Sequence, residues 1–182
     1  MATVITSSAV TVNGTALGAG GGEVKQIKYV YPTPDVVALN TGSWTEITSD
    51  LRVAITPTSA SSKLIIQFLF LYNSKGSANL SHYAVYNVTD SGNIETSMGT
   101  NAGNRIFAHA SARNASGDLN NAAMVEVKVI TSASSTSART YTLYHKSEPS
   151  STEKLFFGGG STNHSGISLT KPSAMIWEVT AT

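Results

Sequence analysis

The chain has 182 residues, of which 41% are hydrophobic and 13% are charged, and its formal net charge is +1. That length suits one domain, or one domain with an appendage, and it is long enough to bury a core without covalent staples. The absence of cysteine excludes disulfides, thiolate metal sites and cysteine nucleophiles, and it agrees with assembly in a cytosol. A net charge so close to zero offers little attraction to a phosphate backbone, so we expect no nucleic-acid partner.

Hydroxyl side chains dominate the polar residues. The 25 serines and 22 threonines make up 47 of the 182 residues, and the charged fraction is about half of what is ordinary. Because net charge is what normally keeps proteins apart, this composition tolerates extensive contact between subunits. The first 22 residues contain no basic n-region and no apolar h-region, and the longest apolar stretch, 64–72, is interrupted by Gln67. We therefore expect no signal peptide and no membrane partner.

The first 22 residues are uncharged, mostly small or hydroxylated, and end in three glycines. Val10 and Val12 precede the dipeptide 13–14 (Asn-Gly), which favours a two-residue hairpin turn because both residues accept positive φ. We predict that 1–22 is an N-terminal arm, made of a short hairpin and a glycine-rich hinge. Two short strands bury too little to stand alone, so Val10, Val12 and Leu17 are predicted to contact a partner surface.

From residue 23 onward the hydrophobic pattern has a period of two, which indicates strands, and we predict one β-sandwich domain over 23–182. The predicted strands are 27–31, 44–48, 51–55, 64–72, 82–88, 105–110, 124–130, 139–146, 154–157 and 174–180. Short strands separated by Gly, Pro, Asn and Ser turns indicate an all-β sandwich or barrel. The count fits an antiparallel jelly-roll-like sandwich, and an immunoglobulin-like sandwich stays open.

The predicted strand over 64–72 is apolar on both faces. Its two faces carry Leu64, Ile66, Phe68, Phe70 and Tyr72 on one side and Ile65, Leu69 and Leu71 on the other. In a two-layer sandwich only one face of a strand meets the core. The N-terminal segment or another subunit must cover the second face, so we predict Ile65, Leu69 and Leu71 as contact residues.

No cluster of ionisable residues indicates catalysis or metal binding, and we predict no catalytic residue, no metal and no cofactor. The four histidines are His82, His109, His145 and His164. No two of them lie within four positions of each other, whereas zinc sites usually include a closely spaced pair. We predict His82 and His145, like Glu126 and Glu178, on the solvated faces of their strands. A small hydrolase on the sandwich is the weakest alternative.

A carbohydrate platform is a stronger alternative, because aromatic rings stack on the apolar faces of sugars. The candidate aromatic residues are Tyr29, Tyr31, Trp44, Tyr83, Tyr86, Tyr141 and Tyr144. They fall within or beside predicted strands, which favours sandwich core or subunit contact over ligand binding. We assign Trp44 and Tyr141 to subunit contact and keep a glycan as the alternative ligand.

Residues 51–70, LRVAITPTSASSKLIIQFLF, join a strand ending in Ile-Thr-Pro to a Ser-rich turn and a Ser-Lys-Leu-Ile-Ile strand. This segment resembles the repeated sequence pattern of phage tail-fibre and related virion surface domains. Similar segments are WTEI at 44–47, RTYTL at 139–143, MIWEV at 175–179 and, in the arm, VTVNGTAL at 10–17. The resemblance spans roughly residues 43–180 and rests on strand and turn patterns.

The resemblance implies a trimeric, non-enzymatic, jelly-roll-like sandwich that is assembled in the host cytoplasm and exposed on a virion. Its partners would be copies of itself and other virion proteins, namely the major capsid protein or tail proteins. The chain lacks the extended stalk or repeat array of long fibres. We therefore expect a capsid decoration or cement protein whose arm lies on a neighbouring shell subunit. The alternative is a short tail fibre or fibre tip that binds a host surface glycan.

Overall fold

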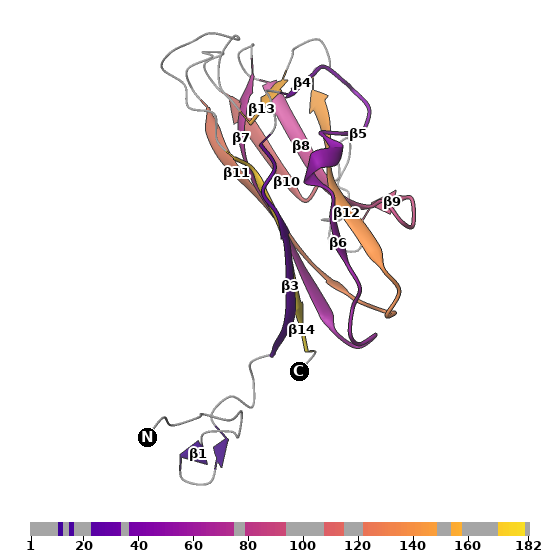
Figure 1. The fold of residues 1–182 in the computed structure, drawn as a ribbon. Coiled ribbons are helices and arrows are strands. Elements are labelled where there is room, and N and C mark those ends of the chain that lie inside the picture. Colours follow the sequence, from indigo (N-terminus) through magenta and orange to yellow (C-terminus); the bar gives the residue numbers. More distant parts are fainter. Residues whose placement is uncertain are drawn as a thin grey trace, which may run out of the picture.

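The structure, a computed structural model, describes residues 11–12, 15–16, 23–33, 37–74, 79–93, 108–114, 122–148, 154–157 and 171–180. Its regular elements are β-strands and one short 3-10 turn. All but two of the strands form two antiparallel sheets that pack face to face (Figure 1). The all-β sandwich predicted from the sequence is therefore confirmed.

The first sheet is built around the longest strand, β7, and we call it the β7 sheet. Its strands are β3 (Val24–Val30), β4 (Val37–Leu39), β7 (Lys63–Ser74), β11 (Ala123–Ser132), β13 (Lys154–Phe156) and β14 (Ser173–Val179). β11 pairs along one side of β7, and β14 followed by β13 pairs along the other. β3 lies outside β14 and β4 lies outside β13, so the order across the longer strands is β3-β14-β7-β11.

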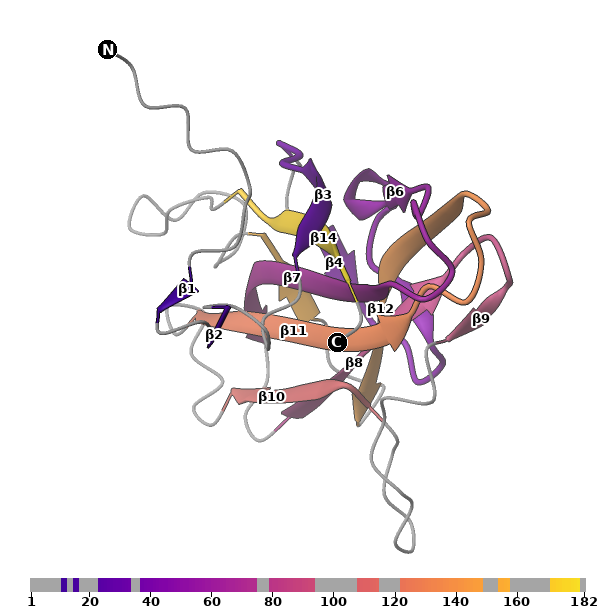
Figure 2. The same cartoon turned by 90° about the horizontal axis from the view of Figure 1, so that it is seen from below.

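The second sheet, which we call the β12 sheet, covers the inner side of the first. Its strands are β5 (Thr45–Glu46), β6 (Val53–Ile55), β8 (Asn79–Asn87), β9 (Gly92–Asn93), β10 (Ala110–Asn114) and β12 (Arg139–Glu148). The order is β6-β12-β8-β10, with β5 also paired to β12 and β9 to β8. β3 approaches β6 along one side of the sandwich and β11 approaches β10 along the other, as the end-on view in Figure 2 shows.

The core lies between the two sheets and consists of alternate residues of each strand. β7 contributes Leu64, Ile66, Phe68, Phe70 and Tyr72, all of them buried. These side chains meet Val53, Ile55, Tyr83, Val85, Tyr141 and Leu143 of the β12 sheet. Aromatic rings fill one end of the core, where Phe70 and Tyr83 pack edge to face with their ring centroids 5.1 Å apart. Burial of one face of each strand fixes the register, because a slip of one residue would turn the apolar set toward solvent.

Residues 11–16 contain a separate two-stranded ribbon (Figure 1). β1 (Thr11–Val12) pairs with β2 (Thr15–Ala16), and Val12 lies opposite Thr15. The hairpin turn predicted at 13–14 (Asn-Gly) falls on residues outside the described part of the chain.

The strands differ from the predictions at several places, of which three bear on the core and its edges. The predicted strand 105–110 corresponds to β10 at Ala110–Asn114, and residues 105–107 lie outside the described part of the chain. β4 was not predicted, because its three residues follow a proline-rich segment. Leu51 belongs to the 3-10 turn η1 (Ser49–Leu51) instead of to a strand, and its buried side chain anchors that turn to the core.

Three side chains predicted to face solvent are buried: His82, His145 and Glu178. His145 shares the inner face of β12 with Leu143, and its ring lies 5.0 Å from the ring of Phe156. The prediction for these three side chains was wrong because it assigned every polar residue of an alternating strand to the face that meets solvent. A buried polar group is tolerated when hydrogen bonds replace its hydration.

Candidate assembly face

The outward side of the β7 sheet carries apolar side chains from one edge to the other. Residues opposite each other in neighbouring antiparallel strands point to the same side of a sheet. One such row crosses four strands and consists of Ile27, Trp177, Ile65 and Ile130. Tyr29 and Met175 lie opposite each other in the next row, and Leu71 and Met124 do so further along. We call this side of the sheet the apolar face.

Large hydrophobic residues that remain exposed are concentrated on this face. Seven of the eight found among the described residues belong to it: Val24, Ile27, Tyr29, Tyr31, Leu69, Met124 and Ile130. The eighth, Leu80, lies on β8 in the other sheet. Scattered apolar residues are normal on protein surfaces, whereas a contiguous patch marks an interaction site.

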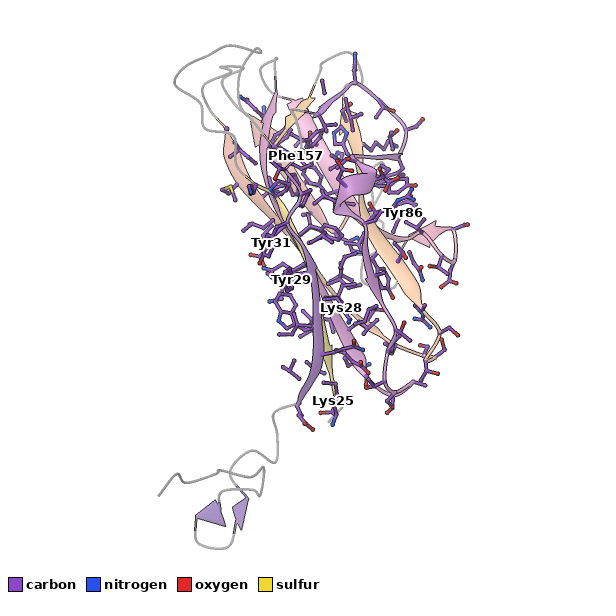
Figure 3. The ribbon with its side chains drawn as sticks, viewed as in Figure 1. Lys25, Lys28, Tyr29, Tyr31, Tyr86 and Phe157 are labelled. Carbon is purple, nitrogen blue, oxygen red and sulfur yellow. The ribbon has the colours of Figure 1, made fainter. Side chains whose placement is uncertain are left out.

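β3 shows the most unusual orientation. Its apolar residues Ile27 and Tyr29 point outward, while Gln26 and Lys28 lie on the inner side together with Val30, which packs against the core. Tyr29 is 63% exposed. Figure 3 shows Tyr29 and Tyr31 projecting from β3 away from the body of the sandwich. This pattern is the reverse of what a solvated edge strand normally adopts, because burial of apolar side chains sets strand register.

Side chains on the apolar face make both aromatic and polar contacts with one another. The rings of Tyr29 and Tyr31 are 5.3 Å apart, and the Tyr31 hydroxyl donates to Met175 Sδ at 3.6 Å. Near the β11 edge, Gln67 Nε2 donates to Glu126 Oε1 at 2.7 Å. Lys128 follows Glu126 at the next outward position, so opposite charges lie side by side on this strand.

The predicted contact residues fall into three groups. Ile65, Leu69 and Leu71 all lie on the apolar face, where Leu69 is 36% exposed, Ile65 is half-buried and Leu71 is almost covered. Tyr141 is 2% exposed and lies in the core, so its side chain does not reach the surface on which it was predicted. The reason is its position on β12, where it shares the inner face with Leu143.

The other predicted contacts lie elsewhere. Trp44 precedes β5 on the opposite sheet and is half-buried. Val12 belongs to β1, of which the structure describes the backbone. Val10 and Leu17 lie outside the described residues.

The sequence predictions missed the two edges of the apolar face. Ile27, Tyr29 and Tyr31 alternate with Lys28 and Val30, and this period of two does not say which face of the strand meets the core. Met124 and Ile130 share β11 with Val125, Val127 and Val129, which take the inner positions. The sequence signal in β11 was weaker than in β7, because the outward residues Met124 and Ile130 flank the charged Glu126 and Lys128.

A smaller aromatic cluster lies on the outer side of the β12 sheet. Tyr86 and Tyr144 stack with ring centroids 3.9 Å apart, and the Trp44 ring lies 6.4 Å from Tyr86. Beside them, Arg52 Nε and Nη2 donate to the two oxygens of Glu46 at 2.8 and 2.7 Å. The hydrogen bonds from Arg52 lower the pKa of Glu46 despite partial burial, and the Thr142 hydroxyl adds to the shift. Figure 3 places Tyr86 on the side of the sandwich opposite Tyr29.

Two polar side chains of the core lie close together and away from solvent. His145 Nε2 lies 3.3 Å from Ser81 Oγ, and both side chains are completely buried. Within the described ranges, no group of three His, Asp or Glu side chains is placed to hold a metal ion. No helix in this part of the chain has the length and apolar character needed to cross a membrane.

Neither a scan against protein-family models nor a search of curated proteins finds a match for this chain.

Proposed function

We propose that this chain is a non-enzymatic structural subunit of a tailed-phage virion, which assembles as a trimer of β-sandwiches through the apolar face. The single observation that carries the assembly part is the inverted β3, whose Ile27 and Tyr29 face solvent while Lys28 lies on the inner side. Within one subunit this orientation lets Gln26 bind Glu178 and Val30 reach the core, but it leaves Ile27 and Tyr29 in water. A second copy that covers the face would remove its apolar surface from water, at about 25 cal/mol for each Å².

The strand order supports the jelly-roll part of the proposal. In chain order, the eight strands that make up the two four-stranded layers are β3, β6, β7, β8, β10, β11, β12 and β14. Numbered one to eight, they are arranged 1-8-3-6 in one sheet and 2-7-4-5 in the other. Each sheet thus alternates early and late strands, as two interleaved Greek keys do.

The place on the virion rests on the sequence resemblance. We favour a capsid decoration or cement protein, in which the sandwiches project outward and the uncharged arm lies on a neighbouring shell subunit. The near-neutral, hydroxyl-rich composition supports close packing against other proteins.

Light scattering and particle imaging test this proposal. The purified full chain at micromolar concentration should have a mass three times 19.0 kDa. A label attached at Thr182 should decorate the shells of particles that incorporate the chain. A mass of one subunit would refute the trimer, and particles without label would refute the virion location.

A short tail fibre or fibre tip that binds a glycan is the second candidate, and the aromatic cluster of the β12 sheet favours it. Assembly through the apolar face would not cover the outer side of the β12 sheet. The rings of Trp44, Tyr86 and Tyr144 lie there, beside the ion pair of Arg52 and Glu46. Aromatic rings and rigid hydrogen-bonding groups together recognise sugars. Labelled tails, with saturable oligosaccharide binding that Trp44→Ala abolishes, would select this candidate.

A further inference from the structure

The exposure of the apolar face increases toward its two edges. At one edge Tyr29 and Tyr31 of the β3 side are 63% and 54% exposed, and at the other Met124 and Ile130 of β11 are 54% and 58% exposed. In the middle, Trp177 and Ile65 are only half-buried. An interface formed by one partner normally has an apolar centre and a polar rim. Here the apolar residues extend to both rims.

From this distribution we infer that each subunit uses the apolar face to contact two neighbours, with the β3 edge of one copy packed against the β11 edge of the next. This inference rests on the proposed homo-oligomer and specifies how its subunits meet. Such a contact is heterologous, because two different surfaces of the same chain meet, and repeated rotation closes it into a ring. In a ring every β3 edge and every β11 edge is covered, including Tyr29 and Met124.

The charges on the apolar face are compatible with the binding of a second copy of the chain. The β11 edge carries one acid, Glu126, and one base, Lys128, at successive outward positions. At the start of β3, Lys25 and Glu23 form an ion pair at 2.6 Å. Each edge thus brings balanced charge, and a chain with a net charge of +1 is not repelled by copies of itself.

Complementation between two edge variants tests the ring. Tyr29→Asp places a carboxylate on the β3 edge, and Met124→Asp places one on the β11 edge. Because burying an unpaired charge is costly, each change should weaken its interface about 100-fold or more, and each variant alone should be monomeric by light scattering. A one-to-one mixture retains one intact interface, between the β11 edge of Tyr29→Asp and the β3 edge of Met124→Asp. It should therefore form a complex of two chains, one of each variant, which native mass spectrometry identifies.

Leu80→Asp is the matched control, since Leu80 is an exposed hydrophobic residue on the other sheet. It should keep the mass of the wild-type chain. If Tyr29→Asp or Met124→Asp fails to fold by circular dichroism, Tyr31→Lys or Met124→Lys replaces it at the same edge. Two monomeric variants that do not combine, or one variant that still assembles as the wild type does, would overturn the ring. A monomeric wild-type chain would instead refute the proposed oligomer itself.

Discussion

Glu178 is a buried carboxylate that joins β14 to β3 and to the turn between β6 and β7. Its oxygens accept hydrogen bonds from Gln26 Nε2 on β3 at 2.7 Å and from the backbone N–H of Thr58 at 2.8 and 2.9 Å. The Thr58 hydroxyl and the Ser59 N–H also donate to it, at 2.8 and 3.1 Å. Burial would raise the pKa of Glu178, but these hydrogen bonds outweigh that effect and lower the pKa to about 2.

The lowered pKa predicts a loss of stability in acid. A carboxyl whose pKa is lower in the folded chain than in the unfolded chain stabilises the fold above its unfolded pKa. For Glu178 that contribution should be complete above about pH 4.5 and should disappear as the pH falls toward 2. Glu178→Gln should lower the free energy of unfolding at pH 7 by about 2 kcal/mol, because amide hydrogens would face the N–H donors of Thr58 and Ser59.

Urea denaturation from pH 7 to pH 2.5 measures this effect. The wild-type chain should lose stability more steeply below pH 4.5 than Glu178→Gln does. Asp50→Asn, which removes an exposed carboxylate of η1, controls for the loss of one negative charge. Parallel pH profiles for the wild type and Glu178→Gln would show that Glu178 does not have this role.

Sequence patterns predict the position of Glu178 poorly for a physical reason. A charged residue in an apolar strand is normally solvated, and the donors that make its burial favourable come from a turn about 120 residues earlier. No local spacing reveals that partnership.

At the scale of elements, alternate residues of β7 have two different roles, in the core and on the apolar face. Phe68 points into the core and is buried, whereas Leu69 lies on the apolar face. Large-to-small changes in a core cost several kcal/mol because a cavity remains, while a partly exposed side chain has less to lose. The two neighbouring residues should therefore respond differently to truncation.

Urea denaturation of variants in the monomeric Tyr29→Asp background makes this comparison. Phe68→Ala should lower the free energy of unfolding by about 3–4 kcal/mol, and Leu69→Ala by less than about 1 kcal/mol. In the assembled wild-type background, Leu69→Ala should also weaken association. Equal destabilisation by the two changes in the monomer would mean that the Leu69 side of β7 is already enclosed within one subunit.

The elements themselves were largely predictable from the sequence. β7, β11, β12 and β14 are long, and the period-two pattern fixed their positions within a few residues. Short elements that depend on neighbours, such as β4 and η1, were missed. The orientation of β3 was beyond local patterning, because alternation gives two faces but does not say which one meets the core. Its pairing with β14 decides that, with Trp177 opposite Ile27.

At the scale of the whole molecule, the sandwich has two outer surfaces with different chemistry. The β7 sheet presents the apolar face, and the β12 sheet presents the Trp44, Tyr86 and Tyr144 cluster with its ion pair. Assembly through the first surface would leave the second accessible on every subunit. A trimer would then display three such clusters, and multivalent display strengthens the binding of a repetitive ligand without any new contact.

The coverage of the apolar face by other copies can be measured with its own tryptophan. Trp177 lies on that face, and Trp44, the other tryptophan of the chain, lies on the opposite sheet. A Trp44→Phe background therefore reports on Trp177 alone. Acrylamide should quench its fluorescence at least about two-fold less in the assembled chain than in the same background carrying Tyr29→Asp, because an interface excludes water and solutes. Equal quenching in the two proteins would contradict the account, since it would leave the apolar face open to solvent in solution.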